Sequence, residues 1–270
     1  MNTLIFLHVP KAAGSSFVKI LHSNYSESVR FDVSAGGRYV DNLEILREMS
    51  PARKDELRVV YGHLPFGVHE LLPQQSQYIS ILRNPIDRIV SHYYFVREQP
   101  KHYLHSAVVG QNLSLAEYVQ SGLSGELTNG MTRLLSGRPS QDSLRGHDPC
   151  TEEDFFAAVR HIHHHFSAVG IVEQYDRSLS LFCRMFGWKN TARTRLNVTR
   201  SRVALSSLDN RTLRIIEEHN AYDLELYAMV LQRFETQCNA LNVYSSEEGV
   251  SLSGSFIRDL WDCVYRRLNR

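Results

Sequence analysis

The sequence predicts an α/β fold with a mainly parallel central sheet, and two features of the chain favour this fold. Apolar runs rich in strand formers occur at residues 4–7, 58–61, 78–82 and 168–172. Segments with helical spacing of apolar residues alternate with these runs, as in α/β proteins. The chain has 270 residues, of which 43% are hydrophobic, so it is long enough to build one sizeable core.

The domain organisation expected from the sequence is one domain over residues 1–244, a linker over 245–255 and a C-terminal amphipathic helix over 256–270. The linker is expected because the stretch SSEEGVSLSGS is rich in serine and glycine. The apolar side of the terminal helix consists of Phe256, Leu260, Trp261, Val264 and Leu268. This stripe is short, so we expect it to dock on the core or to form a homodimer contact rather than to enter a membrane.

The overall charge excludes binding to nucleic acid or to a membrane surface through bulk charge. The formal net charge is +1, so an anionic ligand must be held by a local arrangement of donors. The apolar run near the N-terminus is too short for a signal sequence or a membrane span. A cytoplasmic location is the simplest expectation. Glycosylation sequons, for example at Asn24 and Asn112, keep open the alternative of a lumenal domain that lacks its anchor.

No metal site is expected. The four cysteines at positions 150, 183, 238 and 263 are scattered and show no zinc-ligand spacing, so reduced thiols are the default interpretation. Histidines at positions 161, 163, 164 and 165 share one segment, but no carboxylate–histidine motif accompanies them. We therefore expect this cluster to be an exposed or acceptor-facing helix surface.

The stretch from residue 4 to residue 17 predicts a buried strand, a tight turn and the start of a helix. Such a turn aims backbone N–H groups and the positive end of the helix dipole at one point, which suits a phosphate or sulfate. Lys11 adds a positive charge, and Ser15 and Ser16 add hydroxyl donors. The lysine precedes Gly14, so the stretch is not the GxxxxGK[ST] loop of nucleotide triphosphatases. An ordinary turn with a surface lysine is the alternative.

A second candidate anion site follows the strand at residues 78–82, where the chain reads RNPIDRIVSHYY. Asn84 is expected to cap the helix that follows. Arg83 lies at the carboxyl end of the strand, where parallel sheets bind ligands, and Ser91 lies two turns into the helix. Arg83 offers a two-pronged grip on a phosphate. Two anion sites on one edge suggest one ligand with two anionic groups; the alternative is that Arg83 and Arg88 pair with carboxylates.

These two segments together resemble the cofactor-binding segments of sulfotransferases that use 3′-phosphoadenosine 5′-phosphosulfate (PAPS). HVPKAAGSSF and RNPIDRIVSHYY carry the resemblance, which is closest to the carbohydrate branch of heparan sulfate and uronyl 2-O-sulfotransferases. It extends through YGHLPFG, TRLLSG and HFSAVGIVE and covers most of residues 3–235. The resemblance implies a P-loop-like three-layer α/β/α fold, PAPS as donor with PAP as product, and no required metal.

The resemblance also implies a role for each matching residue. Lys11 would contact the 5′-phosphate and the bridging oxygen and stabilise charge on the leaving group, and His63 would be the general base. Arg83 and Ser91 would hold the 3′-phosphate. The residues that would line the phosphosulfate site with Lys11 are Ala12, Ala13, Gly14, Ser15, Ser16 and Phe17. The late basic loop would contribute Arg200, Ser201 and Arg202, for which a solvated loop is the alternative.

The sequence departs from the family pattern at Ala12, where relatives often carry threonine, which removes one hydroxyl but no backbone donor. We expect in-line transfer of a sulfuryl group to a hydroxyl of a carbohydrate or glycoconjugate, a reaction that depends on positioning and charge stabilisation. One alternative is a small-molecule kinase, which the position of Lys11 and the missing magnesium motif disfavour. Another is a non-catalytic nucleotide- or glycan-binding module, which the presence of Lys11 with His63 disfavours.

Overall fold

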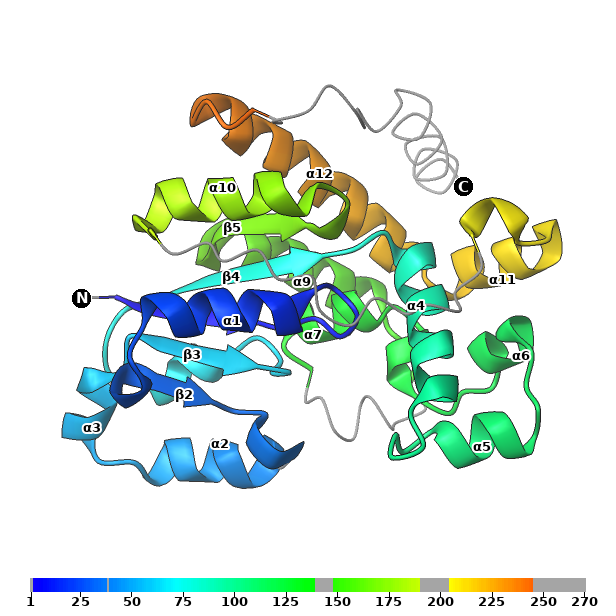
Figure 1. Ribbon diagram of the computed structural model, residues 1–270, viewed down its shortest axis with the longest axis horizontal. Helices are drawn as coiled ribbons and strands as arrows, with labels where there is room; N and C mark the ends of the chain where they lie inside the picture. The colour runs from blue at the N-terminus through cyan, green and yellow to red at the C-terminus, as the bar shows by residue number, and fades with distance from the viewer. Residues whose placement is uncertain (1, 38, 139–147, 190–203, 245–270) are drawn as a thin grey trace.

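The computed structural model describes residues 2–37, 39–138, 148–189 and 204–244 (Figure 1). Its centre is one sheet of five strands in the order β2-β3-β1-β4-β5, with every neighbouring pair parallel. The strands are β1 (Thr3–Leu7), β2 (Arg30–Asp32), β3 (Val59–Gly62), β4 (Ser76–Leu82) and β5 (Phe166–Ile171). The expected α/β fold with a parallel central sheet is confirmed.

The sheet register brings three strand ends together. β1 lies between β3 and β4, and Leu7 at its carboxyl end is paired with Gly62 of β3 and with Ser80 of β4. The segments that follow these three strands therefore leave the same edge of the sheet side by side. These segments contain Lys11, His63 and Arg83, the three residues that the sequence analysis singled out for the chemistry.

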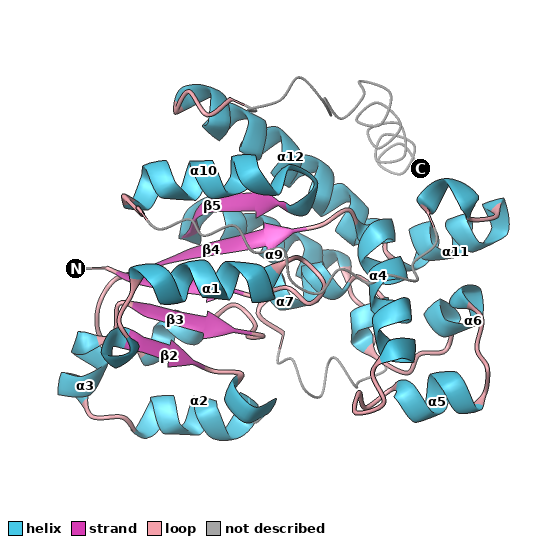
Figure 2. Cartoon of the chain, in the orientation of Figure 1, coloured by secondary structure: helices cyan, strands magenta, loops and turns pink. Residues whose placement is uncertain are grey.

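Helices cover both faces of the sheet (Figure 2). The α-helices are α1 (Gly14–Asn24), α2 (Tyr39–Glu48), α3 (Pro51–Glu56), α4 (Pro85–Glu98), α5 (His105–Gly110), α6 (Leu115–Gln120), α7 (Gly130–Ser136), α9 (Glu152–His165), α10 (Tyr175–Phe186), α11 (Asn210–His219) and α12 (Ala221–Ala240). Helices α1 and α10 lie on one face and α7, α9 and α12 on the other, and α4, α5, α6 and α11 lie beyond the carboxyl ends of the strands (Figure 1). This is a three-layer α/β/α arrangement.

The short 3₁₀ segments mark the turns between these elements. They are η1 (Glu27–Val29), η2 (Ala35–Gly37), η3 (Val68–Leu71), η4 (Gly125–Leu127), η5 (Val172–Gln174) and η6 (Leu205–Ser207). Of these, η4 matters for the site, because it packs beside α4 through a hydrogen bond from Nη2 of Arg88 to the carbonyl of Glu126, 2.8 Å long.

Aromatic packing holds the first helix to the sheet and to its neighbour. Phe17 of α1 is fully buried, and its ring centroid lies 4.6 Å from that of Phe6 in β1 and 5.2 Å from that of Phe182 in α10. Trp188 closes the same cluster, with its ring 5.7 Å from Phe17. Burial of large aromatic side chains stabilises this layer, so the turn between β1 and α1 is anchored at both ends.

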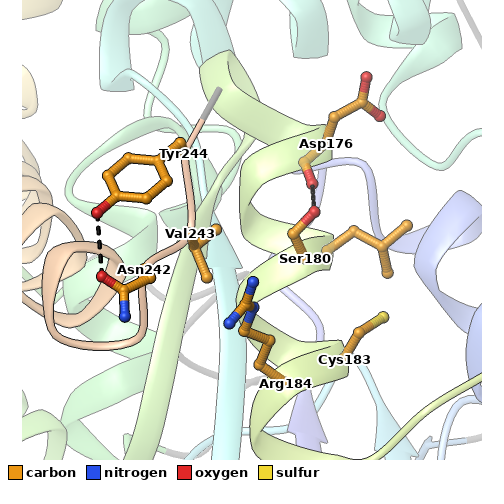
Figure 3. Close-up of a pocket in the computed structure, with 8 residues that line it drawn as sticks. Asp176, Ser180, Cys183, Arg184, Asn242, Val243 and Tyr244 are labelled. Carbon is orange, nitrogen blue, oxygen red and sulfur yellow. Dashed lines mark hydrogen bonds between the residues drawn. The ribbon is translucent and has the colours of Figure 1, made fainter. Parts of the chain in front are cut away.

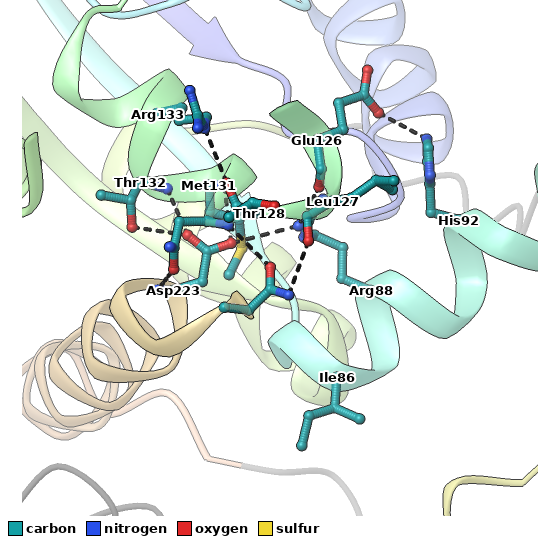
Figure 4. Close-up of polar contacts among 12 residues, drawn as sticks. Ile86, Arg88, His92, Glu126, Leu127, Thr128, Met131, Thr132, Arg133 and Asp223 are labelled. Carbon is teal, nitrogen blue, oxygen red and sulfur yellow. Dashed lines mark hydrogen bonds and ion pairs between the residues drawn. The ribbon is translucent and has the colours of Figure 1, made fainter. Parts of the chain in front are cut away.

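A buried polar network joins the second layer to the helices beyond the sheet (Figure 4). Asp223 of α12 is fully buried and accepts hydrogen bonds from the backbone N–H groups of Met131 and Thr132 and from the Thr132 hydroxyl. Nη2 of Arg88 lies 3.5 Å from Oδ2 of Asp223, and the Arg88 side chain is only 1% exposed. The ion pair expected for Arg88 in the alternative interpretation is therefore present.

Several elements differ from the expectation. The short strand β2 and the helices α3 and α5 were not expected, because their sequences are short and polar and show little apolar periodicity. The apolar periodicity of residues 209–234 predicts one long helical region, but the structure divides it at Asn220, whose backbone leaves the helical conformation with φ −125° and ψ 31°. The Asn220 side chain explains the break, since it accepts from the N–H of Asn129 and donates to the carbonyl of Leu127.

The expected linker and the expected terminal helix lie outside the described residues, as does the basic loop with Arg200, Ser201 and Arg202. Residues 245–255 and 256–270 therefore stay predictions.

Candidate functional site

The turn between β1 and α1 has an unusual backbone. Lys11 and Ala13 adopt left-handed conformations with φ 64° and 58°, although neither is glycine. Each such residue costs about 1–3 kcal/mol, and conformations of this kind cluster at ligand sites. When left-handed and right-handed backbone conformations alternate, successive N–H groups point into one concave site, which is the geometry of an anion-binding nest. The backbone of this turn is thus suited to an anionic ligand.

The N-terminus of α1 opens onto this turn. Ala13 is the N-cap residue and provides no side-chain cap, and helix geometry leaves the N–H groups of Gly14 and Ser15 without an intrahelical partner. The N–H groups of Ser16 and Phe17 bond to the Ala13 carbonyl. An anion bound here would take the place of the missing cap and would lie at the positive end of the helix dipole.

The side chains expected to line this turn are unequally accessible. Ser15 is exposed, whereas Ser16 and Ala12 are buried. The Ala12 N–H bonds to the carbonyl of Val9. The Phe17 side chain belongs to the core, so Phe17 faces the candidate site with its backbone only.

Arg83 connects the two predicted anion sites. Its Nη1 donates to the carbonyl of Lys11 at 2.9 Å, which ties the end of β4 to the turn after β1. Its Nε donates to Oδ2 of Asp87 at 2.7 Å, and Nη2 lies 2.6 Å from the same oxygen. The carboxylate partner foreseen by the alternative interpretation is therefore Asp87. A guanidinium has five N–H groups, so these contacts leave two for a ligand.

One face of α4 lines the candidate site. Asp87, Ser91 and Phe95 are spaced four residues apart, so they lie along the same side of the helix. Asp87 contacts Arg83, and Phe95 contacts Lys11. Ser91, between them, therefore lies between Arg83 and Lys11. Ser91 is 5% exposed, and its hydroxyl has no hydrogen-bond partner among the described residues. The hydroxyl is therefore available to donate a hydrogen bond to a ligand.

The Lys11 ammonium rests on an aromatic ring. Nζ lies 3.6 Å from the centroid of the Phe95 ring, which is a cation–π contact. Burial, together with the positive charge of Arg83, lowers the pKa of Lys11 to about 8, although the carboxylates of Glu98 and Glu126 act in the opposite direction. With this pKa, Lys11 is mostly protonated at neutral pH and loses its charge near pH 8.

His63 directly follows β3, and its ring is oriented by a hydrogen bond between Nδ1 and a backbone carbonyl. Its Nδ1 lies 2.9 Å from the carbonyl oxygen of His8, and its backbone N–H donates to the hydroxyl of Ser34. Because a carbonyl oxygen only accepts, this contact requires the proton on Nδ1, and the lone pair of Nε2 is then available. The His63 side chain is exposed, so a substrate can reach it.

Sequence reasoning missed several residues that the fold brings to this edge. His8 stacks on His63 with ring centroids 4.0 Å apart, and Phe95 supports Lys11. Oε2 of Glu126 in η4 lies 2.8 Å from Nε2 of His92, the residue after Ser91. His8 directly follows β1, as His63 directly follows β3, but the resemblance implied a role for His63 alone. Nothing in the local sequence marks Phe95 or Glu126.

The histidines of α9 have a structural environment. His161 stacks on Phe66 with centroids 3.8 Å apart, and its Nδ1 lies 2.9 Å from the carbonyl of Leu135. His69 and His165 border the same ring. In the part of the chain that the structure describes, no group of three or more histidine, cysteine, aspartate or glutamate side chains has a geometry that would hold a metal ion.

A hollow of about 330 Å³ lies away from these residues (Figure 3). Its lining comes from α10 and from the segment after α12, and consists of Asp176, Leu179, Ser180, Cys183, Arg184, Asn242, Val243 and Tyr244. Burial raises the pKa of the Cys183 thiol, so this side chain is no activated nucleophile. None of the predicted site residues lines this hollow.

The chain matches the model of one known protein family over most of its length. The model of a family described as the sulfotransferase family matches residues 1–229 of this chain. The chain belongs to the sulfotransferase family. Within the part of the chain that the structure describes, no helix has the length and apolar character needed to cross a membrane.

Relatives of this chain include two curated enzymes. Heparan sulfate 2-O-sulfotransferase 1 of Xenopus laevis is 31% identical over 113 residues, which are 35% of this chain and 29% of that enzyme. Heparin sulfate O-sulfotransferase of Drosophila melanogaster is 24% identical over 263 residues, which are 86% of this chain and 72% of that enzyme. The match thus covers less than a third of the frog enzyme and most of the fly enzyme.

One solved structure aligns with most of this chain. The crystal structure of mouse sulfotransferase SULT7A1 complexed with PAP aligns with a TM-score of 0.40 and 14% sequence identity, over 81% of this chain and 64% of the mouse chain.

Proposed function

We propose that this protein is a PAPS-dependent O-sulfotransferase that acts on a hydroxyl group of a carbohydrate or glycoconjugate. The observation that carries the proposal is the hydrogen bond from Arg83 to the Lys11 carbonyl, because it joins the end of β4 to the turn after β1 at the carboxyl edge of the sheet. A donor with a 5′-phosphosulfate and a 3′-phosphate carries two separated anionic groups that match this arrangement. Membership of the sulfotransferase family supports the same donor.

The residues at the edge fit the two anionic ends of this donor. The left-handed turn and the uncapped start of α1 fit the 5′-phosphosulfate, with Lys11, Ala12, Ala13, Gly14, Ser15, Ser16 and Phe17 contributing backbone or side-chain groups. Two N–H groups of Arg83 and the hydroxyl of Ser91 fit the 3′-phosphate. Arg200, Ser201 and Arg202 stay predicted contacts of the late basic loop.

His63 and Lys11 supply the chemistry that the chain contributes. PAPS supplies a sulfuryl group that breaks its bond to a phosphate oxygen as it forms a bond to the acceptor oxygen. Nε2 of His63 accepts the proton of the acceptor hydroxyl, so that oxygen can form its bond to sulfur. The Lys11 ammonium faces the leaving oxygen and stabilises the charge that it gains. The chain's own residues provide a base and a cation for the reaction, without a role for a metal.

A carbohydrate acceptor is supported by the names of the curated relatives, which are sulfotransferases of heparan sulfate or heparin. A homodimer, a cytoplasmic location and the absence of a nucleic-acid partner stay predictions, with a lumenal location as the alternative.

Titration calorimetry tests the proposed donor, with PAP and ATP compared on the same protein. PAP should bind, and ATP should bind far more weakly, because its triphosphate places no phosphate on the 3′ position. Preference for ATP would favour the kinase alternative and contradict the proposal. Binding of PAP without transfer of labelled sulfate from PAPS to any of a panel of glycans and simple glycosides would favour the non-catalytic module.

A further inference from the structure

His8 occupies a central position in the site that the proposed reaction leaves without a role. It follows β1 directly and lies between the proposed base and the phosphosulfate turn. Its ring stacks on His63 with centroids 4.0 Å apart and planes inclined by 29°. On another side it stacks with Phe6, whose ring centroid is 5.6 Å away. Its ring is thus in contact with aromatic neighbours from both β1 and the end of β3.

Gly14 is the third neighbour of this ring. A Cβ atom placed on Gly14 would lie 1.9 Å from both Cδ2 and Nε2 of His8, which no real side chain allows. Gly14 does not have a positive φ, so its backbone conformation does not require glycine. Glycine is needed here because any side chain would collide with the His8 ring. The His8 ring rests directly against the first residue of α1, so it joins the proposed base to the candidate phosphosulfate site.

The backbone of His8 is fixed to the same strand end. Its N–H donates to the carbonyl of Gly62 at 2.9 Å, and its own carbonyl oxygen lies 2.9 Å from Nδ1 of His63. The two bonds hold the residues after β1 and β3 in one register. The carbonyl contact also determines which nitrogen of His63 carries the proton.

The His8 ring itself is kept uncharged. Burial, with His63 and the Lys11 ammonium nearby, holds the pKa of His8 well below its ordinary value. A neutral ring stacked on His63 presents its π face to the positive charge that His63 gains when it accepts a proton. A charged His8 would instead repel both His63 and Lys11.

We propose that His8 is a positioning residue for His63: its carbonyl keeps the proton on Nδ1, and its ring, braced against Gly14, holds the imidazole so that Nε2 faces the acceptor hydroxyl. This inference rests on the proposed function. The His8 side chain, in contact with both His63 and Gly14, would fix the distance between the base and the donor site. Small errors in such a distance are costly, since a misplacement of 1 Å can lower a rate about 100-fold.

The test compares His8→Ala, which removes the ring, with His8→Asn, which keeps a planar group next to Cβ. His163→Ala is the control, because His163 is exposed on α9 and outside the site. Two readouts are collected for each protein. The first is the tautomer of His63, from the ¹⁵N chemical shifts of its ring in the protein without donor. The second readout compares the change in kcat with the change in the Kd for PAP.

The wild-type protein should have His63 with its proton on Nδ1. His8→Ala keeps the backbone carbonyl at position 8 but removes the ring that holds the His63 imidazole against it. It should therefore give a mixture of His63 tautomers and lower kcat about tenfold or more, with the Kd for PAP changed by less than about threefold. His8→Asn should recover part of the lost kcat, and His163→Ala should match the wild type. An unchanged tautomer with unchanged kcat in His8→Ala would overturn the proposal, and so would a wild-type His63 with its proton on Nε2.

The two proposals fail in different ways. The tautomer of His63 is measured without donor or acceptor, so it reports on His8 even if no transfer of sulfate is found. If the wild type binds no PAP and transfers no sulfate, the proposed function fails whatever the tautomer is. If His8→Ala does not fold, as its circular dichroism would show, the tautomer in the wild type and in His8→Asn decides the matter.

Discussion

The Lys11 ammonium lies 3.6 Å from the centroid of the Phe95 ring, at the edge where the proposed donor binds. The contact holds the ammonium group of Lys11 in a partly buried position near Arg83. Burial and the neighbouring Arg83 lower the pKa of Lys11 to about 8. A catalytic cation with such a pKa makes the pH dependence of the reaction informative.

The basic limb of kcat/KM should lie near pH 8, because kcat/KM reports ionisation in the free enzyme and Lys11 loses its charge there. The loss occurs on the alkaline side, since a lysine is active when protonated. Lys11→Arg keeps a charge at all accessible pH values. It should therefore remove this limb, even if it lowers the rate. A basic limb that stays near pH 8 in Lys11→Arg would assign that ionisation to another group.

Lys11→Ala should lower kcat about 100- to 1,000-fold, the range seen when a charge-stabilising donor is removed from a transition state. The Kd for PAP should rise by much less, because the contribution of Lys11 grows as charge develops on the leaving oxygen. Single-turnover rates and calorimetry with PAP give the two quantities. Lys19→Ala, an exposed lysine of α1, is the control. Weaker PAP binding with an unchanged kcat would mean that Lys11 only binds the donor.

Arg83→Lys should weaken PAP binding about 10- to 100-fold, because charge-assisted hydrogen bonds contribute about 1.5–3 kcal/mol each. Lysine cannot keep the contacts with Asp87 and with the Lys11 carbonyl while it also binds a phosphate. The comparison with 5′-AMP makes the test specific, since this nucleotide lacks the 3′-phosphate. Its affinity should change less than that of PAP. An equal loss for both ligands would place Arg83 elsewhere than at the 3′-phosphate.

Asp223→Asn should destabilise the fold by about 3–5 kcal/mol, because it leaves the buried Arg88 without its charge partner. It also turns one acceptor of the N–H groups at the start of α7 into a donor. Urea unfolding monitored by circular dichroism measures the change, as a shift of the midpoint at constant slope. Glu44→Ala, which removes an exposed ion pair with Arg47, should cost less than about 1 kcal/mol.

The sequence predicted the features of the fold that depend on local patterns. Apolar runs located β1, β3, β4 and β5, and the order of an apolar run, a Gly/Ser turn and a helical stripe predicted the turn between β1 and α1. The alternation of strands and helices then implied that these turns share one edge. By contrast, β2 has three residues that are only partly buried, so its sequence carries no strand signal.

What the sequence could not predict depends on contacts between distant segments. The break at Asn220 arises from hydrogen bonds to residues 127 and 129, more than 90 positions away, while the helical periodicity runs on through it. The ring of Phe95 under Lys11 requires the relative placement of α4 and the β1–α1 turn. The place of His8 depends on the absence of a Cβ at Gly14, which only the folded turn brings near.

The central claim is that this edge transfers a sulfuryl group with His63 as the base, and transfer of ³⁵S from labelled PAPS to a carbohydrate acceptor tests it most directly. The wild type and His163→Ala should give labelled product, and His63→Ala should give it about 100- to 10,000-fold more slowly, the usual contribution of a general base. Labelled product formed by His63→Ala at the wild-type rate would contradict the account.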